Sequence, residues 1–306
     1  VEVNGELKDL SYPITQDCTL KILKKDADEA LELIRHDCAH VMAEAVQQLY
    51  PGTQVTIGPA IDNGFYYDFS REEAFTLDDL GKIEKKMHEI IDLGFPFERQ
   101  VWDRSEAIKY FEDIGEIYKS EIIKDLPKEE EISIYRQGEW MDLCRGPHLP
   151  TTKHIGKAFK LMKVAGAYWR GDEKNEMLTR VYGTAWRTEK ELDTYLNMLQ
   201  EAEKRDHRKI GKELKIFTFD DEVGAGLPLW LPNGSIIIEE LEKLAKETED
   251  KAGYDRVRTP HITKGSLYEK SGHLSHYKDS MFPAMNIDGT EYYLKPMNCP
   301  HHHKIF

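Results

Sequence analysis

The sequence has 306 residues, of which 40% are apolar and 32% are charged. This length exceeds that of an ordinary single domain, so we expect two or more compact units, each with its own core. The 42 basic and 56 acidic residues give a net charge of −14, which opposes long-range attraction to a polyanion. Any contact with nucleic acid would therefore have to be local.

Membrane and secretory classes are disfavoured by the same composition. No apolar run approaches the length that a bilayer-spanning helix needs, and the first ten residues lack the basic start and apolar core of a signal peptide. The cysteines are far apart and form no CxxC pair, which argues against a disulfide framework and for a reducing compartment. We therefore expect a cytoplasmic protein without a membrane partner. The four cysteines are Cys18, Cys38, Cys144 and Cys299.

The N-terminal half alternates between strand-like and helical patterns. Val3-Asn4-Gly5 favours a tight hairpin within residues 1–24. Apolar residues at helical spacing then predict a helix over 26–50, which Pro51 and Gly52 end. A segment rich in glycine and aromatic residues follows, and a second amphipathic helix is expected over 77–93.

The C-terminal half begins with a clear helix start. Thr188 and Glu191 fit a capping box, and the apolar spacing behind them predicts one long helix over 188–213 whose polar second half would connect two domains. Strand-like runs begin at Ile216. They precede an amphipathic helix over 236–248 and a strand that ends at Pro260.

Basic residues gather in two stretches, Lys153–Lys163 and Lys204–Lys215. These stretches are candidates for a local nucleic-acid contact. An isolated cluster of this kind is more often the solvated face of a helix.

The first group of reactive residues combines an HxxxH helix motif with a CxxxH turn. His36 and His40 are four residues apart and share one helix face, while Cys144 and His148 flank a Gly-Pro turn. Three imidazoles and a thiol suit a tetrahedral zinc site, and they equally suit a metal-free acid–base site. A third alternative is that two helix histidines merely lie near a core cysteine.

The second group is the segment YYLKPMNCP, which ends in Cys299 and Pro300. Taken alone, one cysteine is more often a small buried apolar residue than a ligand. His301, His302 and His303 follow so closely that they need not converge with Cys299 on one metal.

Several motifs together resemble the threonyl-tRNA synthetases of bacterial type, a class II aminoacyl-tRNA synthetase family. The proofreading domain of that family is matched, in order, by HDCAH, IGPAIDNGFYYD, Lys119, DLCRGPH and FKLMKVAGAYWRGD, and the match continues through EKRDHRKIGKEL. A related domain occurs in alanyl-tRNA synthetase. The family implies a pocket that hydrolyses seryl-tRNA, with water and leaving group positioned by neighbouring side chains. The catalytic residues that it implies are His36, His40, Lys119, Asp142, Cys144 and His148.

The resemblance also implies the fold class and the domains. The expected fold is α+β and multidomain, with an α/β proofreading domain and part of an antiparallel class II catalytic domain. The expected divisions are a β-grasp remnant over 1–24, the proofreading domain over 25–187, a linker helix over 188–213 and the start of the catalytic domain over 214–306. The helix and strand over Ile236–Pro260 resemble the first class II signature, which implies a homodimer through this region.

For the whole family member, the resemblance implies ATP-dependent joining of threonine to its tRNA, with ATP, magnesium and zinc. Cys299 would be one zinc ligand, and its two histidine partners would lie beyond Phe306. The second and third class II signatures do not occur in these residues, so we expect this chain to be competent only for the hydrolysis. The alternatives are a zinc-dependent hydrolase, a free-standing aminoacyl-tRNA deacylase and a tRNA-binding scaffold. A HExxH glutamate is absent, since residue 37 is Asp, and this disfavours the first of them.

Overall fold

In the computed structural model, which describes all of residues 1–306, the chain forms two compact units. The first unit is Val1–Arg205 and the second is Asp206–Phe306. The predicted mixture of helices with antiparallel sheets is confirmed in both units. None of the helices combines the length and the apolar character required to cross a membrane.

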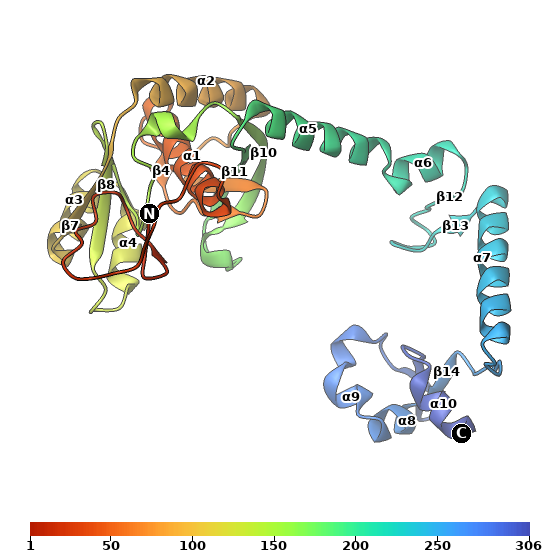
Figure 1. The fold of residues 1–306 in the computed structure, drawn as a ribbon. Coiled ribbons are helices and arrows are strands. Elements are labelled where there is room, and N and C mark those ends of the chain that lie inside the picture. The colour runs from red at the N-terminus through yellow and green to blue at the C-terminus, as the bar shows by residue number, and fades with distance from the viewer. The chain divides into compact units, whose positions relative to one another are not determined.

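The first unit contains three antiparallel sheets (Figure 1). A small N-terminal sheet has the order β2-β1-β3, a second has the order β7-β8-β9, and the largest has the order β10-β11-β6-β4 with β5 also paired to β6. The strands are β1 (Glu2–Val3), β2 (Glu6–Leu7), β3 (Leu20–Lys21), β4 (Gln54–Val55), β5 (Ala60–Ile61), β6 (Gly64–Ser70), β7 (Phe97–Trp102), β8 (Ile132–Gln137), β9 (Trp140–Leu143), β10 (Phe159–Tyr168) and β11 (Met177–Ala185).

Helices pack on two of these sheets. Helices α1 and α2 contact each other and the largest sheet, whereas α3 and α4 pack with β8 around a separate small core. The helices of the first unit are α1 (Asp28–Leu49), α2 (Leu77–Leu93), α3 (Arg104–Asp113), α4 (Ile117–Asp125), α5 (Glu189–Lys204) and the short turns η1 (Thr152–Ile155) and η2 (Trp169–Gly171).

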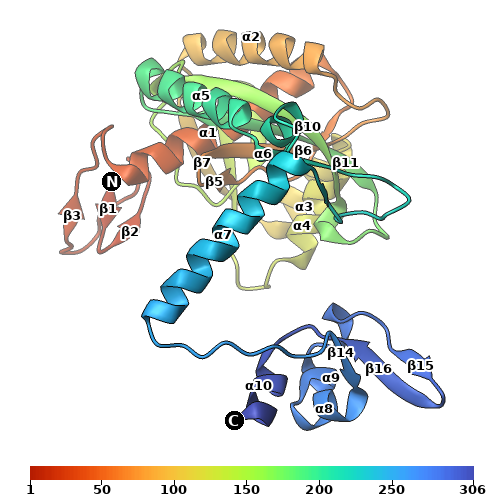
Figure 2. The same cartoon turned by 90° about the vertical axis from the view of Figure 1, so that its right-hand side faces the viewer.

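The second unit has two small antiparallel sheets, β12-β13 and β14-β16-β15. Helix α8 packs on β14 and β16 in this unit (Figure 2). The elements of the second unit are α6 (His207–Glu213), β12 (Phe217–Thr218), β13 (Leu229–Trp230), α7 (Pro232–Lys251), β14 (Ile262–Lys264), α8 (Gly265–Lys270), α9 (His273–His276), η3 (Lys278–Ser280), β15 (Met285–Ile287), β16 (Thr290–Leu294) and α10 (Cys299–Ile305).

The predicted hairpin and the first two helices are confirmed. Asn4 and Gly5 have positive φ angles of 51° and 87°, as a tight turn between β1 and β2 requires. Helix α2 has the predicted bounds and begins with a capping box between Thr76 and Asp79. It ends at Gly94, whose φ of 70° is the left-handed conformation that glycine favours at this position.

The single long helix predicted over 188–213 is wrong. The chain forms α5 and α6 with a break at Arg205 and Asp206, because the Asp206 side chain accepts the Arg208 amide proton and caps a new helix. The capping box predicted at the start of α5 is half formed. The Thr188 hydroxyl accepts from the Glu191 amide, but the Glu191 carboxylate receives the Arg187 amide instead of that of Thr188.

The strand predicted to end at Pro260 is also absent. Residues 253–260 form neither helix nor strand, and β14 begins at Ile262 instead. Pro260 has no N–H to donate to a neighbouring strand, so the ladder with β16 can begin only after it. In this part of the chain, Tyr293 on β16 is 6% exposed, whereas Phe282 is 69% exposed.

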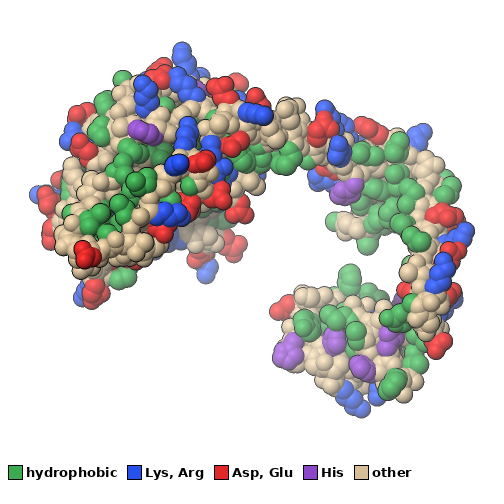
Figure 3. Space-filling view, viewed as in Figure 1, with side chains coloured by type: hydrophobic (Ala, Val, Ile, Leu, Met, Phe, Trp, Pro, Cys, Tyr) green, Lys and Arg blue, Asp and Glu red, His purple; other side chains and the backbone are tan.

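Exposed apolar side chains gather in the second unit over β12, β13 and the start of α7 (Figure 3). Along α7, three of them recur at helical spacing, with exposed fractions of 44% at Ile237, 60% at Leu241 and 62% at Leu244. An unpartnered apolar stripe of this kind is typical of a surface that another element covers. It agrees with the predicted dimer contact over Ile236–Pro260, which stays a prediction.

Candidate functional site

The site lies among helix α1, helix α4 and strand β9 of the first unit, and helix α1 supplies its first side. His36 and His40 project from the same face of α1, with ring centroids 4.8 Å apart. The helix is buried around them, and His40 is only 4% exposed. Residues four positions apart share a helix face, so the predicted orientation of both imidazoles is confirmed.

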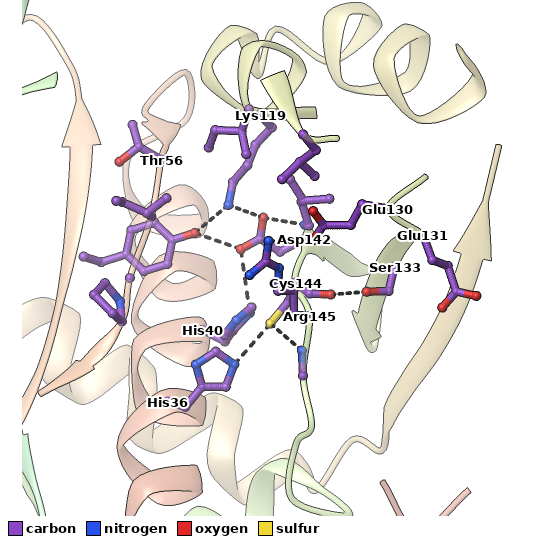
Figure 4. Close-up of a pocket in the computed structure, with 18 residues that line it drawn as sticks. His36, His40, Thr56, Lys119, Glu130, Glu131, Ser133, Asp142, Cys144 and Arg145 are labelled. Atoms are coloured by element: carbon purple, nitrogen blue, oxygen red, sulfur yellow. Dashed lines mark hydrogen bonds and ion pairs between the residues drawn. The ribbon is translucent and has the colours of Figure 1, made fainter. Parts of the chain in front are cut away.

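The second side is the segment that follows β9. Cys144 Sγ lies 3.1 Å from His36 Nε2, and the His148 ring centroid lies 4.8 Å from that of His36 and 4.7 Å from that of His40. The ligand atoms of the three histidines and the cysteine all lie within 4.8 Å of one another. The structure therefore brings together the four residues that the HxxxH and CxxxH motifs predicted. Figure 4 shows three of them, His36, His40 and Cys144.

A buried ion pair forms the third side. Lys119 Nζ on α4 lies 2.6 Å from Asp142 Oδ1 on β9, and both side chains are at most 3% exposed. Lys119 also donates to the Tyr67 hydroxyl at 2.9 Å, and that hydroxyl donates to Asp142 Oδ2 at 2.8 Å. The same Asp142 oxygen is 3.7 Å from His40 Nδ1. The pair is thus adjacent to the histidine cluster.

All of these side chains except His148 line a cavity of about 470 Å³. The segment Thr56–Pro59 also lines it, and Figure 4 shows Thr56 on the side of the cavity where Lys119 lies. Gly58 lies against the Tyr67 ring: a Cβ atom added at Gly58 would come 2.1 Å from Tyr67 Cδ2. Only glycine allows the backbone to approach this closely.

The surroundings of His40 and His148 shift the pKa values of these two histidines in opposite directions. Burial lowers the pKa of His40 and outweighs the charge and hydrogen bond of Cys144, which act in the opposite direction; the neighbouring His148 and His36 lower it further. Burial would also lower the pKa of His148, but the charge and hydrogen bond of Asp37 raise it to about 10. Near neutral pH, His40 therefore favours the neutral form and His148 the cationic form.

The Cys144 thiol has a strongly altered acidity. Burial would raise its pKa, but the charge of His40 and hydrogen bonds with His148, His36 and His40 hold that pKa well below the usual range. The interaction with Cys144 in turn raises the pKa of His36 against the effect of burial. The imidazoles around Cys144 therefore favour its thiolate form.

Comparison with known proteins agrees with the site. A family model described as "Threonyl and Alanyl tRNA synthetase second additional domain" matches residues 132–182, which include Cys144 and His148. The threonine–tRNA ligase of Phenylobacterium zucineum is 55% identical over 306 residues, which are 100% of this chain and 46% of the relative. That of Thiobacillus denitrificans is also 55% identical, over 100% of this chain and 48% of its own length.

The chain belongs to the threonine–tRNA ligase family. It spans about half the length of the curated relatives that it matches. A crystal structure described as the RNA binding domain of threonyl-tRNA synthetase from Cryptosporidium parvum is 37% identical over 33% of this chain and 25% of that chain, with a TM-score of 0.32.

Two site residues of this threonine–tRNA ligase family member were missed in the sequence. Asp37 is fully buried, and its carboxylate lies 2.7 Å from His148 Nδ1 and accepts the Leu149 amide at 2.8 Å. Tyr67 links Lys119 to Asp142. The HDCAH motif contained a signal for Asp37, because an acid beside a buried histidine needs a partner. Nothing in the aromatic run of β6 distinguished Tyr67.

Cys299 is exposed and begins α10. No group of three or more potential metal ligands includes it, so its predicted role in zinc binding stays a prediction. His301 is 7% exposed, and both of its ring nitrogens lack hydrogen-bond partners.

A second buried acid lies behind Lys119. Glu116 precedes α4, accepts the Val55 amide at 2.9 Å and hydrogen-bonds Gln47 of α1. Burial raises its pKa to about 7, although the Val55 hydrogen bond acts in the opposite direction. Because the folded state favours the protonated acid, the contribution of Glu116 to the free energy of unfolding is fully present below the ordinary pKa of 4.5. The contribution is lost as the pH rises through about 7.

We expect Glu116→Gln to remove this pH dependence. A shift of this size corresponds to up to about 3 kcal/mol, so the free energy of unfolding of the variant, relative to the unaltered chain, should increase between pH 5 and pH 8 by up to that amount. Urea unfolding at both pH values measures the difference. Glu121→Gln, an exposed acid on the same helix, is the control and should show no such change. Parallel pH profiles for Glu116→Gln and the unaltered chain would contradict the assignment.

Proposed function

We propose that this chain carries the proofreading activity of a threonine–tRNA ligase: the hydrolysis of seryl-tRNA formed in error on the tRNA for threonine. The observation that supports it best is that His36, His40, Cys144 and the Lys119–Asp142 pair line one cavity, with His148 clustered beside the two histidines and the cysteine. On this proposal, the whole ligase joins threonine to its tRNA with ATP, and this chain supplies the correcting step.

The protonation states suggest how the residues divide the reaction. His40, neutral near pH 7, is suited to accept a proton from the attacking water. Lys119, which lines the cavity, is suited to stabilise the negative charge that develops on the ester oxygen, and the cationic His148 adds positive charge behind His36 and His40. Water adds to the ester carbon, the bond to the ribose oxygen breaks, and the proton held by His40 passes to that oxygen. The products are serine and free tRNA.

The reason for a second site is the small difference between serine and threonine. Serine keeps the hydroxyl of threonine and lacks one methyl group, and a group of that size gives a discrimination of only about 10–200-fold. A separate pocket that admits serine and excludes the extra methyl group multiplies the selectivity. This is the logic of two successive sieves.

A zinc-dependent hydrolase is the second candidate. Three imidazoles and a thiolate within 4.8 Å are a suitable donor set for zinc, and Asp37 would orient His148 as a carboxylate commonly does behind a zinc-bound histidine. Zinc bound there would supply an activated water. Against this candidate, Cys144 Sγ already lies within hydrogen-bonding distance of His36 Nε2, at 3.1 Å, so these two groups satisfy each other without a metal.

The test compares two esters on one preparation of the chain. We expect hydrolysis of seryl-tRNA, at least about tenfold slower hydrolysis of threonyl-tRNA, and the same rates after chelator treatment. Released amino acid and metal content are measured together. Activity that a chelator abolishes and zinc restores would favour the metallohydrolase, and equal rates for the two esters would reject the sieve.

A further inference from the structure

The segment that carries Cys144 and His148 has no regular secondary structure. Residues 144–149 belong to neither helix nor strand, so no continuous ladder fixes their backbone. Loops that hold reactive groups need other supports, because a displacement of about 1 Å in a catalytic group can lower the rate about 100-fold. The supports can be identified from the partners of the loop's amide groups.

Two consecutive amides of this loop donate to carboxylates from distant parts of the chain. The Leu149 amide donates to Asp37 on helix α1. The His148 amide donates to Asp9 Oδ1 at 2.9 Å, although Asp9 is 139 residues away. Asp9 lies outside the proofreading motifs, two residues after strand β2 of the N-terminal sheet.

The other oxygen of Asp9 holds an aromatic residue against the same loop. The Tyr135 hydroxyl on β8 donates to Asp9 Oδ2 at 2.6 Å. The Tyr135 ring is 2% exposed, and its centroid lies 4.2 Å from that of His148. The ring also closes on Gly146, where an added Cβ atom would come 2.0 Å from the Tyr135 hydroxyl oxygen. One carboxylate thus fixes both the backbone of His148 and the ring that packs on its imidazole.

The N-terminal sheet holds Asp9 in place. The Lys8 amide donates to the Val1 carbonyl at 2.9 Å, and the Asp9 carbonyl accepts the Tyr12 amide at 3.1 Å in the turn that follows. The backbone before Asp9 and the Asp9 carbonyl are therefore both hydrogen-bonded, which fixes the position of the Asp9 side chain beside the loop.

We propose that Asp9 is a positioning residue of the proofreading site, through which the N-terminal three-stranded sheet holds the Cys144–His148 loop in its working geometry. This inference rests on the proposed function. It makes the sheet a structural part of the hydrolytic site, although no residue of the sheet reaches the reacting atoms. Loss of the Asp9 carboxylate leaves the His148 amide and the Tyr135 hydroxyl without their acceptor.

The test measures seryl-tRNA hydrolysis by the 306-residue chain with Asp9→Ala, Asp9→Asn and Tyr135→Phe. We expect Asp9→Ala to lower kcat by about 10- to 100-fold, because the loop is misplaced, and to change KM by less than about threefold, because the cavity remains. Asp9→Asn should keep most of the activity, since its amide can accept from the His148 N–H and donate to the Tyr135 oxygen. Asp17→Ala, an exposed acid in the same segment, is the matched control and should leave kcat unchanged.

Amide hydrogen exchange supplies a second measurement. The His148 amide should exchange faster in Asp9→Ala while the amides of α1 stay protected. If Asp9→Ala does not fold, Tyr135→Phe decides, because it deletes only the hydroxyl: a loss in kcat of about threefold or more supports the proposal, and an unchanged kcat overturns it. A folded Asp9→Ala variant with the kcat of the unaltered chain also overturns it. Lack of seryl-tRNA hydrolysis by the unaltered chain would instead reject the proposed function.

Discussion

Replacing His40 by alanine should lower the rate of seryl-tRNA hydrolysis by about 10²–10⁴-fold, the usual contribution of a positioned acid–base group. His40 is the histidine whose pKa the site lowers, so it is the group best able to receive a proton from water near pH 7. The loss should appear in kcat with little change in KM, because the rest of the cavity remains to bind the ester.

The control for this variant is His154→Ala. His154 is exposed and hydrogen-bonds only to the neighbouring Thr151 in the short turn η1, so its removal should leave the rate unchanged. Circular dichroism and thermal unfolding of both variants establish that the fold is kept. An active His40→Ala variant would show that this imidazole has only a packing role, which is the alternative in which two helix histidines merely lie near a core cysteine.

The Lys119–Asp142 pair should show a large effect on both stability and activity. Lys119→Ala leaves Asp142 as a buried carboxylate without its cation, which typically costs about 3–5 kcal/mol in the free energy of unfolding. Hydrolysis should also fall by more than about tenfold, since the cation beside the cavity is lost. The double variant Lys119→Met with Asp142→Leu should regain much of the stability and none of the activity.

Urea unfolding and seryl-tRNA hydrolysis on the same preparations separate these effects. The matched control is Lys124→Ala, which removes an exposed cation of α4 paired with Glu112 and should cost less than about 1 kcal/mol. If Lys119→Ala were as stable as Lys124→Ala, the buried pair would not hold α4 to β9. Activity in the double variant would remove Lys119 from the proposed mechanism.

The parts of the fold that the sequence predicted well are those with local causes. Helices α1 and α2 follow from apolar spacing and from stop signals in the chain, namely Pro51 with Gly52 and Gly94. The break between α5 and α6 was hidden because Asp206 lies among charged residues that also favour helices. The choice between a continued helix and a new N-cap depends on one side-chain hydrogen bond.

The candidate site was predicted as a set of residues, and its supports were not. His36 and His40 share a face by helix geometry alone, and the family resemblance connected them with Cys144 and His148. Asp37 could not be assigned in this way, since its partners lie 111 and 112 residues further along the chain. Their position becomes known only when the loop after β9 is placed against α1.

The close approach of Gly58 to Tyr67 also affects how this pocket can change during evolution. Gly58 lines the cavity, so there is no side chain at position 58 that could be enlarged or reduced to suit a different ester. A mutation there displaces the Tyr67 ring, and with it the hydroxyl that joins Lys119 to Asp142. Variants with altered substrate preference should therefore arise from other positions around the cavity, and position 58 should tolerate almost no replacement.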